Sequence, residues 1–347
     1  MDHAQRQNDG RSSIVRKVAA ILEVLGVFIA GNFTASYLGY LIGVKPLGPI
    51  LGSTIKSVEP DFVPLTVAFL QALLVQYACL LPLAFAIGWW RHQLSLRHYG
   101  VTRAGKPVLE LVVFGLLVFA LVAMPFKLLW VAKRFIPLGE GSAFWALFDK
   151  NWTPSFWLLM AVASFALVPV LEEMFYRGYC QTRLEEDFGG VGAIVIVALF
   201  LTFGHNQYHH LSILSIGTIF ALIPLCLGMG YVYWRSRSLI PAMILHAAVN
   251  VPTKGIYDFI LPAAMVAILI LFRQKWLSMV QDFCRSVAGK GWKRAAFVAT
   301  LLAVTVAIGF ERWHGVFIPL AFVGLAVALF IEFRERRLER ISARVES

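Results

Sequence analysis

About ten long apolar runs, each bounded by charges or turn residues, constrain this chain more than any other feature of its sequence. A run of about 20 apolar residues is long enough to cross a lipid bilayer as one helix. Of the 347 residues, 59% are hydrophobic and 15% charged. Soluble domains average about 45 to 50% apolar and about 25% charged residues. The runs cover residues 20–44, 63–90, 108–131, 155–183, 190–208, 211–234, 239–253, 256–273, 295–310 and 315–333. The sequence therefore predicts an all-α, polytopic membrane protein with about 8 to 10 transmembrane helices.

The basic residues are divided unequally between the two sets of alternate connections. The set that includes both termini carries roughly three times as many Lys and Arg residues as the other set. Because basic loops stay on the cytoplasmic side, this asymmetry predicts a multi-pass protein of the cell membrane with both termini in the cytoplasm. The net charge of +11 has the same origin, so nucleic acid is not expected as a partner.

Three charged residues interrupt the run at 155–183. Glu172 and Glu173 are adjacent, and Arg177 follows four residues after Glu173. A carboxylate at the centre of a bilayer costs at least about 2.5 kcal/mol, so such residues face the protein interior and are paired or functional. On a helix Glu173 and Arg177 can touch, whereas Glu172 points about 100° away. The spacing predicts a Glu173–Arg177 ion pair and leaves Glu172 as the working carboxylate.

Histidines complete the constellation. His205 stands near the end of the run 190–208, and His246 and Asn250 lie four residues apart on one face of the run 239–253. Gly189 and Gly190 mark a turn between the fourth and fifth runs. A helical hairpin about that turn brings Glu172 and His205 to nearly the same depth.

The three motifs, in this order and on consecutive helices, resemble the membrane-embedded CAAX protease and bacteriocin-processing family, also called the abortive-infection or Rce1-like family. Glu172-Glu173-x-x-x-Arg177 is similar to its EExxxR motif, the run ending in His205 to FxxxH, and His246-x-x-x-Asn250 to HxxxN. The second motif departs from the family, because Leu201 stands where the phenylalanine is expected. This departure leaves the neighbouring histidines, His209 and His210, as alternatives to His205.

The resemblance implies an intramembrane endopeptidase without a cofactor or metal. Its substrate would be a membrane-associated peptide or protein, prenylated or not. In the family the first glutamate, here Glu172, activates water together with the histidine here at 205. The histidine and asparagine of the third motif, here His246 and Asn250, would stabilise the oxyanion. Arg177 would keep Glu173 ionised. The expected division is 1–154 for amino-terminal helices, 155–253 for the protease core, and 254–347 for carboxy-terminal helices and a basic tail.

Three other readings of the same residues stay open. His205 and His209 have the i, i+4 spacing of a zinc pair, with Glu172 as a third ligand, although no HExxH motif is present. Intramembrane Glu and His residues also occur in transporters and proton relays. A non-catalytic immunity protein or scaffold belongs to the same non-enzymatic group.

Overall fold

The computed structural model describes residues 10–45, 62–101, 105–139, 153–205, 208, 212–251, 253 and 255–288. Every regular element within these residues is a helix, which confirms the predicted all-α class. The runs at 295–310 and 315–333 and the basic carboxy-terminal tail lie outside the described residues.

Some helices follow one another directly, whereas residues 43–61 separate α1 from α3 and residues 133–153 separate α5 from α7. Their bounds are α1 Gly10–Ile42, α3 Phe62–His92, α4 Val108–Val122, α5 Met124–Ala132, α7 Pro154–Met160, η2 Ala161–Leu167, α8 Val168–Glu173, η3 Met174–Gln181, α9 Thr182–Gly204, α10 Ile213–Ser236, α11 Ile240–Asn250, α12 Tyr257–Leu271 and α13 Arg273–Ala288. The segments η2 and η3 are π-helical. π-Helical turns inside α-helices are frequent at functional sites.

Four helical stretches are long and apolar enough to cross a membrane, namely Arg16–Ile42, Val67–His92, Trp157–Gly204 and Ile213–Ser236. The pairs α4–α5 and α12–α13 pass the same test jointly but are bent by 48° and 83°, so up to six spans are present in the described part of the chain. The sequence predicts more spans than this, and the difference has three sources. Two predicted spans lie outside the described residues, and the fourth and fifth form one continuous helical stretch. The 11-residue α11 is too short to cross a membrane alone.

The stretch Trp157–Gly204 is a hairpin rather than a single rod. As a straight helix its 48 residues would extend about 72 Å, more than twice the hydrocarbon thickness of about 30 Å. Gly189 breaks it with φ 69° and ψ 167°, a conformation that glycine adopts without a steric penalty. The rings of Tyr176 and Phe200, on opposite sides of this break, lie 5.7 Å apart. The turn predicted at Gly189 and Gly190 is therefore confirmed.

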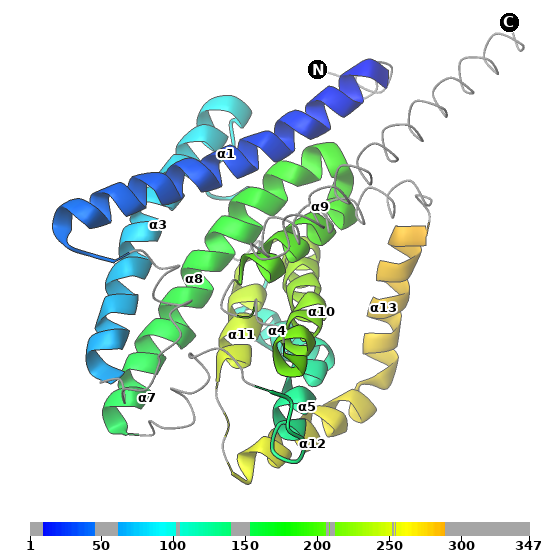
Figure 1. Ribbon diagram of the computed structural model, residues 1–347. Helices are drawn as coiled ribbons and strands as arrows, with labels where there is room; N and C mark the ends of the chain where they lie inside the picture. The colour runs from blue at the N-terminus through cyan, green and yellow to red at the C-terminus, as the bar shows by residue number, and fades with distance from the viewer. Residues whose placement is uncertain are drawn as a thin grey trace, which may run out of the picture.

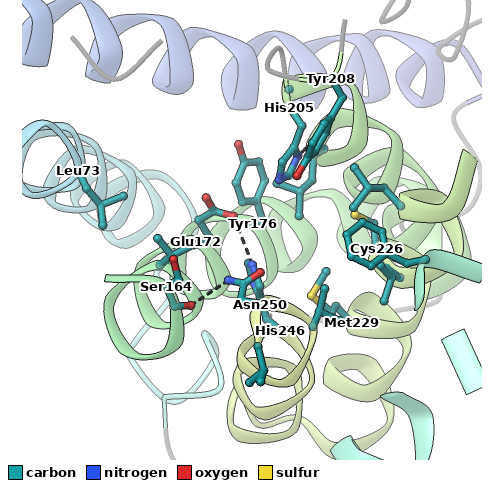
Figure 2. Close-up of a pocket in the computed structure, with 18 of the residues that line it drawn as sticks. Leu73, Ser164, Glu172, Tyr176, His205, Tyr208, Cys226, Met229, His246 and Asn250 are labelled. Atoms are coloured by element: carbon teal, nitrogen blue, oxygen red, sulfur yellow. Dashed lines mark hydrogen bonds and ion pairs between the residues drawn. The ribbon is translucent and has the colours of Figure 1, made fainter. Parts of the chain in front are cut away.

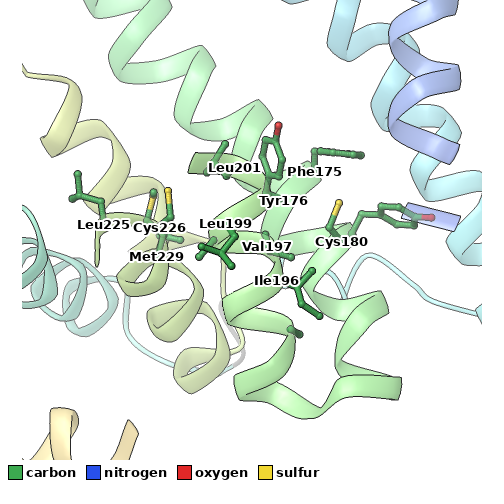
Figure 3. Packing of buried hydrophobic residues seen from close by; sticks show 14 of the residues in the cluster. Phe175, Tyr176, Cys180, Ile196, Val197, Leu199, Leu201, Leu225, Cys226 and Met229 are labelled. Carbon is green, nitrogen blue, oxygen red and sulfur yellow. The ribbon is translucent and has the colours of Figure 1, made fainter. Parts of the chain in front are cut away.

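The hairpin packs on α10 through closely fitted side chains. Figure 3 shows Phe175, Tyr176 and Cys180 of η3 together with the apolar side chains of α9 and α10 around them. Lipid tails are as apolar as these side chains, so van der Waals fit rather than the hydrophobic effect favours such packing inside a bilayer. At Gly190 any larger residue would collide with the indole of Trp234.

Helix α1 crosses one end of the bundle and packs on α3 and α9, while α11 lies against α4, α8 and α10 (Figure 1). The position of α11 matters because it carries two of the predicted site residues. The hairpin 157–204 and α11 thus face one another inside the bundle.

Glu23 of α1 has a buried carboxylate that links several helices at one end of the bundle. Glu23 accepts hydrogen bonds from Tyr179 at 3.3 Å and from Arg183 at 3.2 Å, and lies 3.0 Å from His92. Arg91 reaches its other oxygen at 3.1 Å. Burial and then the Glu23 carboxylate raise the pKa of Tyr99, in the connection after α3, to about 12. The cluster joins α1, α3 and the hairpin, so it anchors the element that carries the glutamates.

Candidate active site

The six predicted site residues come together from four segments of the chain. Glu172, Glu173 and Arg177 lie on α8 and η3, His205 directly follows α9, and α11 supplies the pair of its HxxxN motif. Four of the six line one cavity of about 230 Å³, namely Glu172, His205, His246 and Asn250. Figure 2 shows Glu172, His246 and Asn250 close together, and His205 beside Tyr208 at the same cavity.

The predicted Glu173–Arg177 pair is present and completely buried. Arg177 Nε lies 3.1 Å from Glu173 Oε2, and Arg177 Nη1 donates to Glu173 Oε1 at 3.2 Å. Both side chains are 0% exposed. Arg177 Nη2 donates to the backbone carbonyl of Cys226 in α10 at 3.0 Å. The pair therefore holds η3 against α10 as well as neutralising a charge.

A third member joins this pair. His246 Nδ1 lies 2.8 Å from Glu173 Oε1. Because an ionised carboxylate only accepts hydrogen bonds, Nδ1 carries a proton and Nε2 is the ring nitrogen directed elsewhere. His246 Nε2 lies 3.9 Å from Glu172 Oε2, which is beyond hydrogen-bond reach. Glu173 thus orients the imidazole of α11.

Glu172 differs from its neighbour in lacking an arginine partner, since Oε2 of Glu173 lies 3.1 Å from Arg177 Nε. Its Oε2 is buried and accepts no hydrogen bond from any residue in the described part of the chain. The side chain retains 17% exposure, toward the cavity that it lines. Buried polar atoms are nearly always hydrogen-bonded, so each exception calls for an explanation, and a catalytic role is one of the known explanations. The structure therefore contains the predicted Glu173–Arg177 pair, and the role of Glu172 as the working carboxylate stays a prediction.

His205 is held by the end of its own helix. Its Nδ1 donates to the backbone carbonyl of Leu201 at 2.6 Å. That carbonyl is one of the last four of α9, which have no partner within the helix. With Nδ1 protonated, Nε2 of the neutral ring presents a lone pair. The acceptor is the backbone oxygen of Leu201, so the side chain at this position takes no part in the hydrogen bond.

Asn250 is the last residue of α11, and its amide is oriented by the π-helical segment η2. Nδ2 donates to the backbone carbonyl of Ser164 at 2.8 Å, as the dashed line in Figure 2 shows. One amide proton is used in this bond, so the second proton remains for another acceptor. His246 and Asn250 line the same cavity but are fixed by different partners, Glu173 and Ser164.

Several cavity residues are not among the predicted site residues. They include Tyr77, Lys127, Ser164 and Tyr176. Two of them carried a signal in the sequence. Lys127 is a cation inside an apolar run, and Tyr176 stands four residues after Glu172, on the same helical face. Ser164 contributes its backbone carbonyl, for which no side-chain pattern exists.

The zinc reading depends on His209, which lies outside the described residues, as does His210. Within the residues that the structure describes, no group of three or more His, Cys, Asp or Glu side chains is arranged to hold a metal ion.

Residues 154–252 match the family model described as type II CAAX prenyl endopeptidase Rce1-like. The matched segment runs from α7 to just beyond α11 and contains all six predicted site residues. No curated protein and no solved structure matches the chain.

Proposed function

We propose that the protein cleaves a peptide bond of a membrane-associated peptide or protein, because residues 154–252 match the family model described as type II CAAX prenyl endopeptidase Rce1-like. The observation that carries this proposal is the unpartnered buried oxygen of Glu172 in a cavity shared with His205, His246 and Asn250. These residue types are sufficient for peptide hydrolysis, which needs a base, a proton carrier and donors for an oxyanion.

In the proposed mechanism Glu172 and His205 activate a water molecule between them. The water oxygen attacks the carbonyl carbon of the substrate, and its proton passes to Glu172 or to the free Nε2 of His205. A tetrahedral oxyanion forms. When the carbon–nitrogen bond breaks, the same group returns the proton to the leaving amine.

The donors for the oxyanion are His246 Nε2–H and the second amide proton of Asn250. Both belong to α11, one turn apart, and both side chains are fixed before substrate binds, by Glu173 and Ser164 respectively. Preorganised donors of this kind require no reorientation during the reaction, which is the main source of their catalytic effect.

The role of His246 as a donor sets a requirement on its ring. Nδ1 already donates to Glu173, so a second proton must stand on Nε2 for the ring to donate toward the cavity.

We also propose that residues 155–253 form the catalytic core, with helices of 1–154 and 254–347 around it. The family match supports this division. The excess of basic residues in the connections on the side of the termini supports a cytoplasmic location of both ends.

The decisive test of the activity is cleavage by purified protein in lipid vesicles. A library of hydrophobic peptides, with and without a prenylated cysteine, is incubated with the vesicles, and new ends are mapped by mass spectrometry. We expect cleavage that persists in a chelator such as EDTA. Ion flux across the same vesicles without any peptide cleavage would instead favour the transporter reading, and activity lost to chelator and restored by zinc would favour the zinc reading.

A further inference from the structure

Lys127 is a buried cation in the wall of the catalytic cavity that the proposed mechanism does not use. It lies in α5, its side chain is 5% exposed, and it lines the cavity together with Glu172 and Asn250. An ammonium group is costly to bury inside a membrane helix, and such residues are paired or functional. Its contacts therefore indicate what the group does.

The ammonium group binds the end of the helix that carries the oxyanion donors. Lys127 Nζ donates to the backbone carbonyl of Val249 at 3.2 Å and to that of Val251 at 3.0 Å. These two carbonyls stand immediately before and after Asn250. The last carbonyls of a helix have no hydrogen-bond partner within it, and a cation there also interacts favourably with the negative end of the helix dipole. Lys127 thus acts as a cap supplied by another helix.

The same ammonium group does not neutralise the catalytic carboxylates. No ion pair links Lys127 to Glu172 or Glu173 among the described residues, whereas Arg177 and His246 both reach Glu173. A role for Lys127 in setting the charge of the base is therefore not supported by its geometry. Its hydrogen bonds place its effect on the backbone of α11.

Helices α4 and α5 together contact α11 at both of its ends. Gly115 of α4 lies so close to Pro241, in the first turn of α11, that a β-carbon on Gly115 would stand 2.6 Å from the Pro241 carbonyl oxygen. At the other end, Lys127 holds the carbonyls around Asn250. Just after α5, Arg134 reaches the buried Asp258 of α12 at 2.6 Å. The α4–α5 pair thereby fixes both ends of α11 and the start of the next helix.

We propose that Lys127 is a positioning residue, which holds the backbone on both sides of Asn250 so that the amide stays directed at the oxyanion. This inference deepens the proposed function and rests on it. Asn250 would then be fixed twice, at its side chain by Ser164 and at its backbone by Lys127. A displacement of about 1 Å in such a group lowers turnover by up to about 100-fold.

The test compares Lys127→Met with Lys133→Met. Methionine keeps the length of the side chain but removes the charge and the donors. Lys133, near the end of α5, stacks over Trp130 at 4.8 Å and serves as the matched control for loss of one positive charge. Per folded molecule, we expect Lys127→Met to lower kcat about 10- to 100-fold with KM changed less than about threefold, and Lys133→Met to change neither constant.

A second comparison separates positioning from general structural damage. In an Asn250→Ala background, Lys127→Met is expected to lower kcat less than about threefold, because the group that it positions is already absent. An equal loss of kcat in both backgrounds would show that Lys127 acts independently of Asn250 and would overturn the proposal. If Lys127→Met is not recovered folded, Lys127→Gln, which removes the charge and shortens the reach to the carbonyls, replaces it in the same comparison.

Amide hydrogen exchange tests the positioning role without relying on activity. In Lys127→Met we expect exchange to become at least about tenfold faster in peptides that cover residues 246–251, and to stay unchanged in peptides from α10. Unchanged exchange at 246–251 would refute positioning even in an active enzyme. Absence of cleavage by the unsubstituted protein would instead refute the proposed function, and the exchange result would still decide the role of Lys127.

Discussion

Replacing Glu173 by glutamine should destabilise the protein far more than most single substitutions do. The carboxylate makes two contacts with Arg177, at 3.1 and 3.2 Å, and one with His246 at 2.8 Å, and it is 0% exposed. Glutamine keeps the shape but leaves the guanidinium without a counter-charge. Breaking a buried ion pair from one side costs about 3 to 5 kcal/mol. We therefore expect Glu173→Gln to lower the free energy of unfolding by about that amount.

The measurement is the unfolding equilibrium in mixed micelles with increasing denaturing detergent. Glu185→Gln is the matched control, because Glu185 binds Arg237 through two contacts of 2.6 Å at a site where the arginine is 53% exposed. Exposed pairs contribute about 0 to 1 kcal/mol, so this variant should change stability little. A loss below about 1 kcal/mol in Glu173→Gln would refute the account of a buried pair.

A double substitution, Glu173→Met with Arg177→Met, sharpens the test. Apolar replacement of both partners of a buried pair is often neutral or stabilising. The double variant should therefore recover much of the stability lost in Glu173→Gln. It should not recover activity, since His246 would lose the carboxylate that orients its ring. A double variant as unstable as the single one would contradict the assignment of the loss to an uncompensated charge.

Three further predictions concern individual residues. His246→Ala and Asn250→Ala should each lower turnover more than folded yield. The loss of turnover in the double variant should be far smaller than the product of the two single losses, whereas independent donors would give that product. Leu201→Phe should keep turnover within about threefold per folded molecule, because the backbone carbonyl rather than the side chain holds His205. A large loss of kcat would contradict this account and would show that the Leu201 side chain, which lines the cavity, contributes through its packing. A reporter fused after Ser347 should read as cytoplasmic, and an external signal would overturn the topology.

Local spacing made part of the site predictable. The four-residue interval between Glu173 and Arg177 is a property of any helix, so their pairing could be read from the sequence. The turn at Gly189 and Gly190 also had a local signal, and it placed Glu172 and His205 at similar depth. The structure bears out both, because the two residues line one cavity.

The remaining features depend on contacts between distant segments. The bond from His246 to Glu173 joins residues on different helices, and the sequence assigned His246 only a place on a helical face. The carbonyl of Ser164 is a backbone group, so no residue type announces its role. Glu23 reads as an isolated charge in the first apolar run, and its partners on three other helical segments appear only in the fold.

The central claim is that the carboxylate of Glu172 activates water, and its most direct test is cleavage by Glu172→Gln. Glutamine keeps the size and a hydrogen-bonding oxygen but removes the basic group. Glu110→Gln, at the exposed start of α4, is the matched control. Cleavage of a peptide that the unsubstituted protein cleaves is measured in vesicles, with and without EDTA. The account predicts that Glu172→Gln remains folded and loses cleavage, whereas Glu110→Gln retains it in either condition. Full cleavage by folded Glu172→Gln would contradict the claim.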